Sequence, residues 1–332
     1  MKKILLIGGG GYIGSVIVTD FLKKGYIVNV LESFVYNNQY SIISNLLDKN
    51  FKLFIGDISD SNILKKASKD VDSVVILAGL VGDPITKKFP NQSDSINNLG
   101  VKKCIDFFDK SDIDNLIFIS TCSNYGLIKE NELADEEFEL NPLSLYAKAK
   151  VSAENYLLSK KNKVSYSGTI LRFATAFGIS PRMRFDLTIS EFTKELFFGN
   201  SLSVFDEHTW RPYCHVLDFS NLIHKVIKAD KQKIDFQIFN AGGEENNFTK
   251  KMIIDKITKY IPNADINYVT QGSDPRNYRV SFEKVNKILN FSPMYLVEDG
   301  ILELVDALKI GLWNDSNENK TKYGNYHINF NQ

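Results

Sequence analysis

Residues 3–14 read KILLIGGGGYIG, an apolar run followed at once by glycines. The apolar run is typical of a strand that is buried on both faces. A helix-forming stretch follows the glycines, three of which recur at three-residue spacing: Gly8, Gly11 and Gly14. Such a strand–turn–helix unit lets the backbone approach a pyrophosphate closely and points a positive helix N-terminus at the phosphates. The sequence therefore predicts a dinucleotide-binding unit at the start of the chain.

A carboxylate follows where such a unit contacts a ribose. Glu32 ends the second predicted strand, where its oxygens can accept hydrogen bonds from ribose hydroxyls and would repel a 2′-phosphate. Neither of the next two residues is basic, so NAD is favoured over NADP. Asp57 follows the third predicted strand, beside Ile58. The alternative is a glycine-rich loop without a ligand, with both acids as surface caps, but the place of Glu32 after the glycines favours NAD.

Short apolar runs alternate with helical stretches through the first half of the chain. The runs lack polar alternation, which is typical of strands in a parallel sheet that helices cover on both faces. The predicted strands are Lys3–Ile7, Ile27–Leu31, Phe51–Ile55, Ser73–Leu77, Leu116–Ser120 and Tyr166–Leu171, and the predicted helices between them are Tyr12–Lys24, Asp94–Phe108 and Tyr146–Lys160. Repeated units of this kind predict an α/β fold with a doubly wound parallel sheet, the Rossmann arrangement.

The pattern becomes irregular after residue 180, which predicts a smaller C-terminal α/β lobe that binds substrate. We expect an NAD-binding Rossmann domain over residues 1–180, to which segments near 212–245 return, and the lobe mainly over 181–330. The predicted helices there are Asp186–Phe198, Asp218–Ala229, Thr249–Tyr260, Glu283–Leu289 and Val297–Leu308, and the strands are Leu202–Phe205, Phe236–Asn240 and Asp265–Val269. The polar tail from Trp313 carries no predicted element.

The composition excludes several classes of protein. Forty basic and 40 acidic side chains balance, which gives no electrostatic reason to expect nucleic acid or an anionic membrane as a partner. Three cysteines without CxxC spacing and four histidines without ligand spacing predict neither a disulfide framework nor a metal site. No apolar stretch approaches the roughly 18 residues of a membrane span. We expect a cytoplasmic protein.

Tyr146 and Lys150 stand four residues apart in a helical stretch, so they share one helix face. A tyrosine has an ordinary pKa of about 10, and a neighbouring ammonium, together with the charge of an oxidised nicotinamide, favours the phenolate. Tyr146 can then act as a general base toward a substrate hydroxyl. The spacing alone equally fits a surface helix. Thr121, however, lies at the end of a predicted strand, at the sheet edge where doubly wound folds bind ligands.

Seven segments carry a more specific pattern: GGGGYIG at 8–14, GD at 56–57, LAGLVGDP at 77–84, STCSNYG at 120–126, PLSLYAKAK at 142–150, LRFATAFG at 171–178 and RPYCHVLDF at 211–219. In this order the chain resembles the extended short-chain dehydrogenase/reductase family, of the NAD-dependent nucleotide-sugar epimerase/dehydratase type. The resemblance implies a catalytic triad of Thr121, Tyr146 and Lys150. It implies that NAD is bound by Gly8, Gly11, Tyr12, Ile13, Gly14, Glu32, Asp57, Ile58, Leu77, Ala78, Gly79, Tyr146 and Lys150.

The same resemblance implies a nucleotide-sugar site and a homodimer. Substrate contacts are expected from Thr121, Thr175, Arg184, Arg211 and Arg276. Arg182 and Arg184 are expected near the substrate entrance, and the alternative is a helix-start cluster that pairs with Asp186. The helices Asp94–Phe108 and Tyr146–Lys160 correspond to those that pair between subunits in relatives.

Departures from the family pattern narrow the expected reaction. The 4,6-dehydratases carry an Asp-Glu pair directly after the triad Thr, whereas this chain has Cys122 and Ser123. A thiol and a hydroxyl replace an acid and a base poorly, so dehydration is disfavoured, and Cys122 is expected to shape the pocket. The segments PRMRFDL and DPRNYRVSF look most like a subgroup that acts on GDP-linked hexoses or heptoses for bacterial surface polysaccharide.

We therefore expect an NAD-dependent oxidoreductase or epimerase that oxidises a nucleotide-diphosphate sugar at C4 through a 4-keto intermediate. The alternatives are a 4,6-dehydratase, a 4-keto reductase and a non-catalytic NAD-binding scaffold.

Overall fold

A computed structural model describes residues 1–129, 132–270 and 276–329. Its main element is a seven-stranded parallel sheet with the strand order β10-β6-β5-β4-β1-β2-β3. These strands are β1 (Lys3–Ile7), β2 (Ile27–Glu32), β3 (Phe51–Ile55), β4 (Ser73–Ile76), β5 (Asn115–Thr121), β6 (Ser167–Phe173) and β10 (Gln237–Ala241). The order reverses between β1 and β4, and doubly wound sheets bind ligands beyond the carboxyl ends of the strands at such a point.

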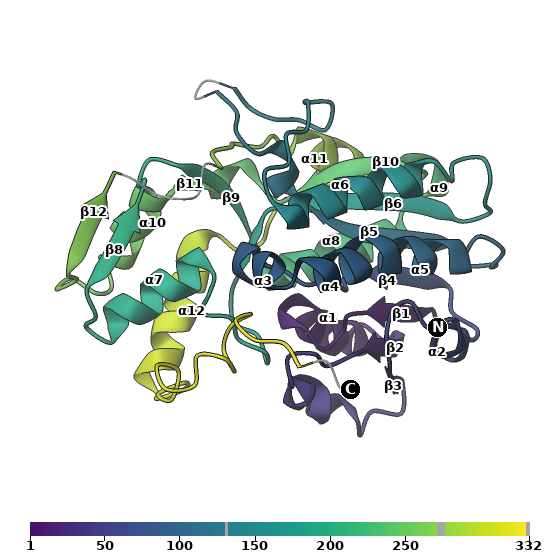
Figure 1. Ribbon diagram of the computed structural model, residues 1–332, viewed down its shortest axis with the longest axis horizontal. Coiled ribbons are helices and arrows are strands. Elements are labelled where there is room, and N and C mark those ends of the chain that lie inside the picture. Colours follow the sequence, from purple (N-terminus) through teal and green to yellow (C-terminus); the bar gives the residue numbers. More distant parts are fainter. Residues whose placement is uncertain (130–131, 271–275, 330–332) are drawn as a thin grey trace.

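Helices cover both faces of the sheet, as the apolar strands require (Figure 1). One face packs against α1 (Tyr12–Lys23) and α8 (Val216–Lys228), with Phe21 and Leu222 fully buried. The other packs against α2 (Ser61–Ala67), α5 (Val101–Phe107) and α6 (Leu145–Leu158), through residues such as Ile105 and Leu157. The doubly wound fold expected from the sequence is confirmed.

A smaller lobe with its own core extends beyond the carboxyl ends of the strands. Its helices are α7 (Thr188–Phe197), α10 (Lys250–Ile257) and α12 (Val297–Lys309). Its strands are β7 (Thr175–Phe177), β9 (Trp210–His215) and β11 (Asn247–Thr249) in one small sheet, and β8 (Leu202–Phe205) and β12 (Ile266–Val269) in another. Helix α8 and strand β10 lie with the large sheet, although they follow the first strands of the lobe in sequence.

The remaining elements are short. They are α3 (Asp83–Lys88), α4 (Pro90–Asp94), α9 (Lys231–Ile234), α11 (Glu283–Leu289), the π-helical turn η2 (Ser95–Gly100), and the 3₁₀ turns η1 (Gln39–Asn45), η3 (Cys122–Tyr125) and η4 (Glu244–Asn246). The single helix predicted over Asp94–Phe108 is therefore wrong in detail: η2 precedes α5 within it. Helix α2 and strand β7 were not predicted.

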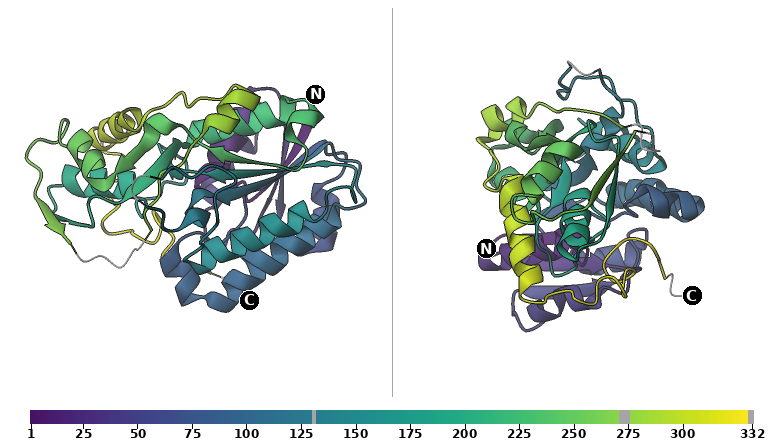
Figure 2. Two further views of the ribbon diagram at one scale, coloured as in Figure 1. Left: turned by 90° about the horizontal axis from the view of Figure 1, so that it is seen from above. Right: turned by 90° about the vertical axis from the view of Figure 1, so that its left-hand side faces the viewer.

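The tail after α12 turns back from the lobe toward the large sheet (Figures 1 and 2), and it reaches the loop that follows β2. The Phe185 backbone N–H donates to the Tyr323 carbonyl, and the Asn329 N–H donates to the Val35 carbonyl, both at 2.7 Å. Ile328 is buried in an apolar cluster with Leu80. The polar tail is thus packed along the structure and connects its two parts.

Candidate active site

A cavity of about 570 Å³ lies at the carboxyl ends of the parallel strands, beneath the smaller lobe. Every site residue expected from the sequence contributes to its lining: Gly8, Gly11, Tyr12, Ile13, Gly14, Glu32, Asp57, Ile58, Leu77, Ala78, Gly79, Thr121, Tyr146, Lys150, Thr175, Arg184, Arg211 and Arg276. Residues from distant parts of the chain thus meet in one space. Their individual roles remain predictions that the geometry below makes testable.

The glycine turn is built for close backbone contacts. Gly8 has φ +94°, and a Cβ there would lie 2.7 Å from the Ala78 nitrogen. A Cβ on Gly14 would lie 2.3 Å from the Gly8 carbonyl oxygen. At Gly11, by contrast, a Cβ would meet only that same oxygen, at 3.6 Å. No protein atom requires glycine at position 11, so the space above it fits a phosphate that approaches the backbone closely.

Backbone amides fix the Glu32 carboxylate. Its Oε2 accepts from the Gly10 N–H at 2.8 Å, and its Oε1 accepts from the Ser33 and Phe34 N–H groups at 3.0 and 3.2 Å. Burial raises the pKa of Glu32, while these amides act in the opposite direction. Asp57 lies at the exposed end of the cavity, and its Oδ1 accepts from the Ser59 N–H at 2.8 Å. Both acids are held in place at the adenosine end expected for NAD.

Lys150 lies in the cavity wall, on the same helix as Tyr146. Helix α6 starts at the Ser144 cap, whose hydroxyl accepts from the Ala147 N–H at 3.1 Å. It presents Tyr146 in its first turn and Lys150 one turn later. The Lys150 ammonium is 3% exposed, donates to the Ile119 carbonyl at 2.7 Å and lies 5.7 Å from the centre of the Tyr146 ring. Burial lowers its pKa to about 8.

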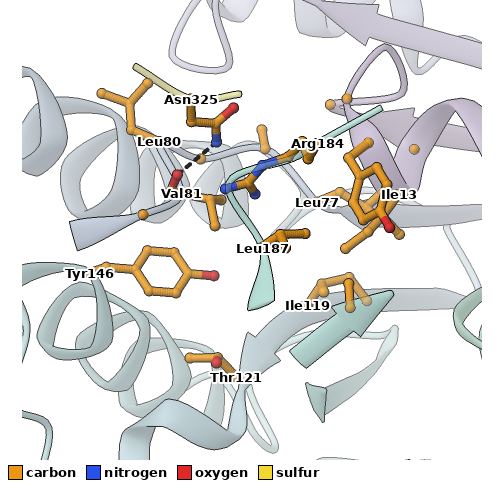
Figure 3. Close-up of a pocket in the computed structure, with 18 of the residues that line it drawn as sticks. Ile13, Leu77, Leu80, Val81, Ile119, Thr121, Tyr146, Arg184, Leu187 and Asn325 are labelled. Atoms are coloured by element: carbon orange, nitrogen blue, oxygen red, sulfur yellow. Dashed lines mark hydrogen bonds between the residues drawn. The ribbon is translucent and has the colours of Figure 1, made fainter. Parts of the chain in front are cut away.

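Tyr146 and Thr121 project into the cavity from different elements (Figure 3). Thr121 ends β5, and its hydroxyl caps η3 by accepting from the Ser123 N–H at 3.1 Å. In the protein alone, burial raises the pKa of Tyr146, and the main influence in the opposite direction is Arg184. The lowered tyrosine pKa expected from Lys150 is therefore absent without the charge of a bound cofactor.

The two arginines after β7, Arg182 and Arg184, both line the cavity. Arg184 is buried and forms a bidentate pair with Asp186, at 2.9 Å from Nε to Oδ1 and 2.6 Å from Nη2 to Oδ2. The alternative of a pair with Asp186 is right for Arg184, but Asp186 precedes the first residue of α7, Thr188. Arg182 is also buried, and no carboxylate of the described chain lies within ion-pair distance of it.

Two further arginines lie on the lobe side of the cavity. The Arg211 guanidinium stacks over the Tyr278 ring at 4.9 Å, and Arg276 forms an ion pair of 3.3 Å with Asp83. Thr175 begins β7 nearby and also faces the cavity. This part of the wall is therefore positively charged and aromatic, which suits a nucleotide diphosphate.

Cys122 does not shape the pocket, contrary to expectation. Its side chain lies in the core, 1% exposed, with the thiol donating to the Arg172 carbonyl on β6 at 3.0 Å. Burial raises the pKa of this thiol, which makes it inert as a nucleophile. Ser123 instead lines the cavity, with its hydroxyl 3.1 Å from that of Tyr278. Neither position after Thr121 thus presents a carboxylate.

Sequence reasoning missed part of the wall. Tyr36, Tyr278 and two residues of the C-terminal tail, Asn325 and Tyr326, line the cavity. Tyr278 lies in the segment DPRNYRVSF but was not expected to contact a ligand, and the other three residues carry no motif, because long-range packing brings them to the cavity. His215, by contrast, is buried and does not line the cavity. Its ring accepts from the Leu217 N–H at the start of α8.

Comparison with known proteins places this geometry in a family. Residues 4–242 match the model of the NAD dependent epimerase/dehydratase family. The chain belongs to that family. The expectation of an NAD-dependent enzyme is thereby confirmed.

Several of the relatives that the chain matches are named as nucleotide-sugar epimerases or dehydratases. The chain is 24% identical to a UDP-glucose 4-epimerase of Lactobacillus helveticus over 322 residues, covering 90% of this chain and 94% of the relative. It is 24% identical to a dTDP-glucose 4,6-dehydratase of Streptomyces niveus over 324 residues, covering 92% of each. Among solved structures, the UDP-glucuronic acid 4-epimerase of Bacillus cereus, in complex with UDP-glucuronic acid and NAD, is similar with a TM-score of 0.83 and 25% identity, covering 93% of this chain and 99% of that one.

Within the described ranges, no three His, Cys, Asp or Glu side chains come together in a way that could hold a metal ion. No described helix has the length and apolarity to cross a membrane.

Proposed function

We propose that this enzyme oxidises a nucleotide-diphosphate sugar at C4 and returns hydrogen to the 4-keto sugar, with net epimerisation at C4. The observation that carries the proposal is the meeting of Thr121, Tyr146 and Lys150 at one cavity, between the glycine turn and the Arg211–Tyr278 wall. A hydride site and a diphosphate site are then adjacent. The lobe formed mainly by residues 181–330 would hold the sugar nucleotide.

The chain's own residues supply the proton chemistry. Tyr146 takes the proton of the C4 hydroxyl as general base, and the Thr121 hydroxyl donates a hydrogen bond to the same oxygen. Lys150 and Arg184 provide positive charge that favours the phenolate. Bound NAD supplies the hydride acceptor. Arg211 and Arg276 are placed to bind the diphosphate, Arg211 over Tyr278 and Arg276 beside Asp83.

The positions after Thr121 argue against the dehydratase alternative. Loss of water needs an acid and a base next to the triad, but Cys122 is buried away from the cavity and Ser123 bonds to Tyr278. A 4-keto reductase would use the same triad and remains the second candidate. A non-catalytic NAD-binding scaffold would not need Thr121, Tyr146 and Lys150 together at one cavity.

The proposal also covers the base of the nucleotide, the oligomeric state and the location of the protein. The sequence resemblance favours GDP-linked hexoses or heptoses, while the named relatives carry UDP and dTDP, so all three bases enter the test. We also propose a homodimer through α5 and α6, which lie side by side at the surface in Figure 2. A cytoplasmic location suits three buried cysteines that form no disulfide.

The test is mass spectrometry, with chromatographic separation of isomers, after incubation with NAD and GDP-, UDP-, CDP- and dTDP-linked hexoses and heptoses. An isomer of unchanged mass supports the epimerase. A product lighter by two hydrogens indicates a dehydrogenase, and loss of water would overturn the argument from Cys122 and Ser123. If nothing reacts, 4-keto sugars with NADH distinguish a reductase from a scaffold.

A further inference from the structure

Arg182 is a buried cation with an incomplete set of partners. It is 3% exposed, and its Nε has no hydrogen-bond partner. Its contacts are one hydrogen bond, from Nη2 to the Asn325 Oδ1 at 2.7 Å, and the Tyr36 ring, 4.6 Å from its guanidinium carbon. Its neighbour Arg184 has a carboxylate partner, Asp186. Asp186 and Glu32 act on Arg182 only from beyond ion-pair distance. A desolvated cation without a carboxylate in direct contact is costly, so its retention in a cavity wall indicates an anionic ligand.

The position of Arg182 identifies the end of the cavity that this ligand would occupy. Tyr36 follows β2 and lines the cavity together with Glu32 and the glycine turn. The charge of Arg182 acts on the Glu32 carboxyl and on the Tyr36 hydroxyl. Arg182 therefore lies on the cofactor side, where the anionic groups of NAD are its two phosphates.

The C-terminal tail holds this arginine. Asn325 is 5% exposed and accepts from Arg182, while its own amide donates to the Val81 carbonyl at 2.7 Å. Its backbone N–H donates to Asp186 at 3.1 Å. Figure 3 shows Asn325 above the cavity, bonded to Val81 and close to Arg184. One side chain thus connects the loop after β4 to the segment that carries both arginines.

The residues around Asn325 anchor the tail at both sides of the cavity. Tyr323 bonds to Phe185 on one side, and Asn329 bonds to Val35 on the other. Between these anchors, Tyr326 lines the cavity and Ile328 is buried. A cofactor in this space would be covered by segment 323–329.

We propose that Arg182 is a phosphate-binding residue of the NAD site and that Asn325 is the positioning residue that orients it, while segment 323–329 retains the cofactor. A retained cofactor suits an enzyme that reuses one NAD in every cycle. The inference rests on NAD dependence and on the site of the proposed function, but not on the identity of the sugar.

The test measures cofactor exchange without any sugar. Bound NADH is displaced by excess NAD in a stopped-flow fluorimeter, which gives the dissociation rate, and NAD affinity is measured by calorimetry. Asn325→Ala should raise the dissociation rate about tenfold, and Arg182→Gln should weaken NAD binding at least tenfold. The matched control is Asn319→Ala, because Asn319 lies in the same tail but its side chain donates to Asp315 and does not line the cavity. It should leave both quantities unchanged.

Asn325→Asp separates a role in binding from a role in folding. The new carboxylate would give Arg182 a permanent counter-charge, so it would compete with the phosphates for the arginine. NAD affinity should fall about tenfold. The melting temperature of the cofactor-free protein should not fall, because the new ion pair with Arg182 offsets the hydrogen bond to the Val81 carbonyl that an aspartate cannot donate. A merely structural role would change both together, which would contradict the proposal. If Arg182→Gln fails to fold, the two Asn325 variants still decide.

A second measurement distinguishes the possible sources of the phosphate. Binding of free GDP and UDP should be unchanged in Arg182→Gln. If nucleotide diphosphate binding weakens while NAD binding does not, Arg182 belongs to the sugar-nucleotide site and the proposal is wrong. Wild-type NAD exchange in Asn325→Ala would also overturn it. Neither result depends on whether the enzyme turns over any sugar.

Discussion

The Lys150 ammonium donates a 2.7 Å hydrogen bond to the Ile119 carbonyl, on the strand that ends at Thr121. Burial lowers the pKa of Lys150 from its ordinary value of 10.5 to about 8. Between about pH 8 and pH 10.5, Lys150 is protonated in the unfolded chain but neutral in the folded protein. The folded protein therefore becomes less stable as the pH falls from 10.5 to about 8. Below pH 8 the full free-energy cost of burying the Lys150 ammonium is present.

Lys150→Met should remove this cost. At pH 7 the variant should be inactive but melt about 2 °C higher than the wild type. The difference in melting temperature should shrink as the pH rises toward 10.5. Calorimetric melting of both proteins from pH 7 to pH 10 checks this. A difference that is constant over that range would mean that Lys150 is charged in the folded protein throughout.

Tyr146→Phe should lower kcat by about 10³-fold, since general-base catalysis contributes about 10²- to 10⁴-fold. NAD binding should change by less than about twofold, because the phenyl ring keeps the apolar contacts of tyrosine. Initial rates on the substrate found in the product screen, with calorimetric titration of NAD, provide the measurement. Full activity in this variant would remove Tyr146 from the mechanism.

The sequence predicted those features that short segments control. The turn at Gly8 needs a positive φ and a close approach to Ala78. Only glycine meets both requirements, so the residue type alone indicates the turn. The strand ends that carry Glu32 and Thr121 follow from apolar runs of the right length. For such residues, spacing in the sequence corresponds directly to position in the structure.

Features that depend on long-range packing left no local signal. Arg182 and Asn325 are separated by 143 positions and meet only because the tail returns across the cavity. Cys122 stands next to Thr121, but the turn after β5 directs its thiol to the Arg172 carbonyl on β6. Residue types alone do not show which side chains of the turn after a strand point into a cavity and which point into the core.

Cys122→Ala should therefore affect the fold and leave the chemistry unchanged. The thiol lies outside the cavity, so kcat and KM for the sugar should stay within about twofold, while the loss of buried volume lowers the melting temperature by a few degrees. Ser123→Ala is the matched comparison, because Ser123 faces the cavity and bonds to Tyr278. It should change KM for the sugar. A large loss of kcat in Cys122→Ala alone would restore Cys122 to the site.

The proposed dimer can be tested on the surface of η2. Leu99 is 50% exposed there, and Leu145 at the start of α6 is 45% exposed. Leu99→Lys should convert the dimer to a monomer, as measured by light scattering, because an ammonium would be desolvated in the interface. Leu47→Lys is a suitable control, since Leu47 is 96% exposed and lies outside α5, α6 and η2. A wild-type protein that is monomeric at micromolar concentration contradicts the proposal.

Arg184 should control the pH dependence of turnover. It lowers the pKa of Tyr146, against the effect of burial, and the tyrosine must lose its proton to act as a base. Activity should then rise with pH through the tyrosine pKa, and removing the cation should move that rise to higher pH. Because Arg184 also pairs with Asp186, the clean variant is Arg184→Gln with Asp186→Asn, which leaves no unpaired carboxylate.

Arg184→Lys is the control for this experiment, since it keeps the charge but loses the bidentate geometry. Its pH–rate profile should stay near that of the wild type, even if its overall rate is lower. The measurement is kcat/KM from pH 6 to pH 10 for all three proteins. If the double variant rises at the same pH as the wild type, Arg184 does not act on the catalytic tyrosine, and the bound cofactor with Lys150 must set its pKa.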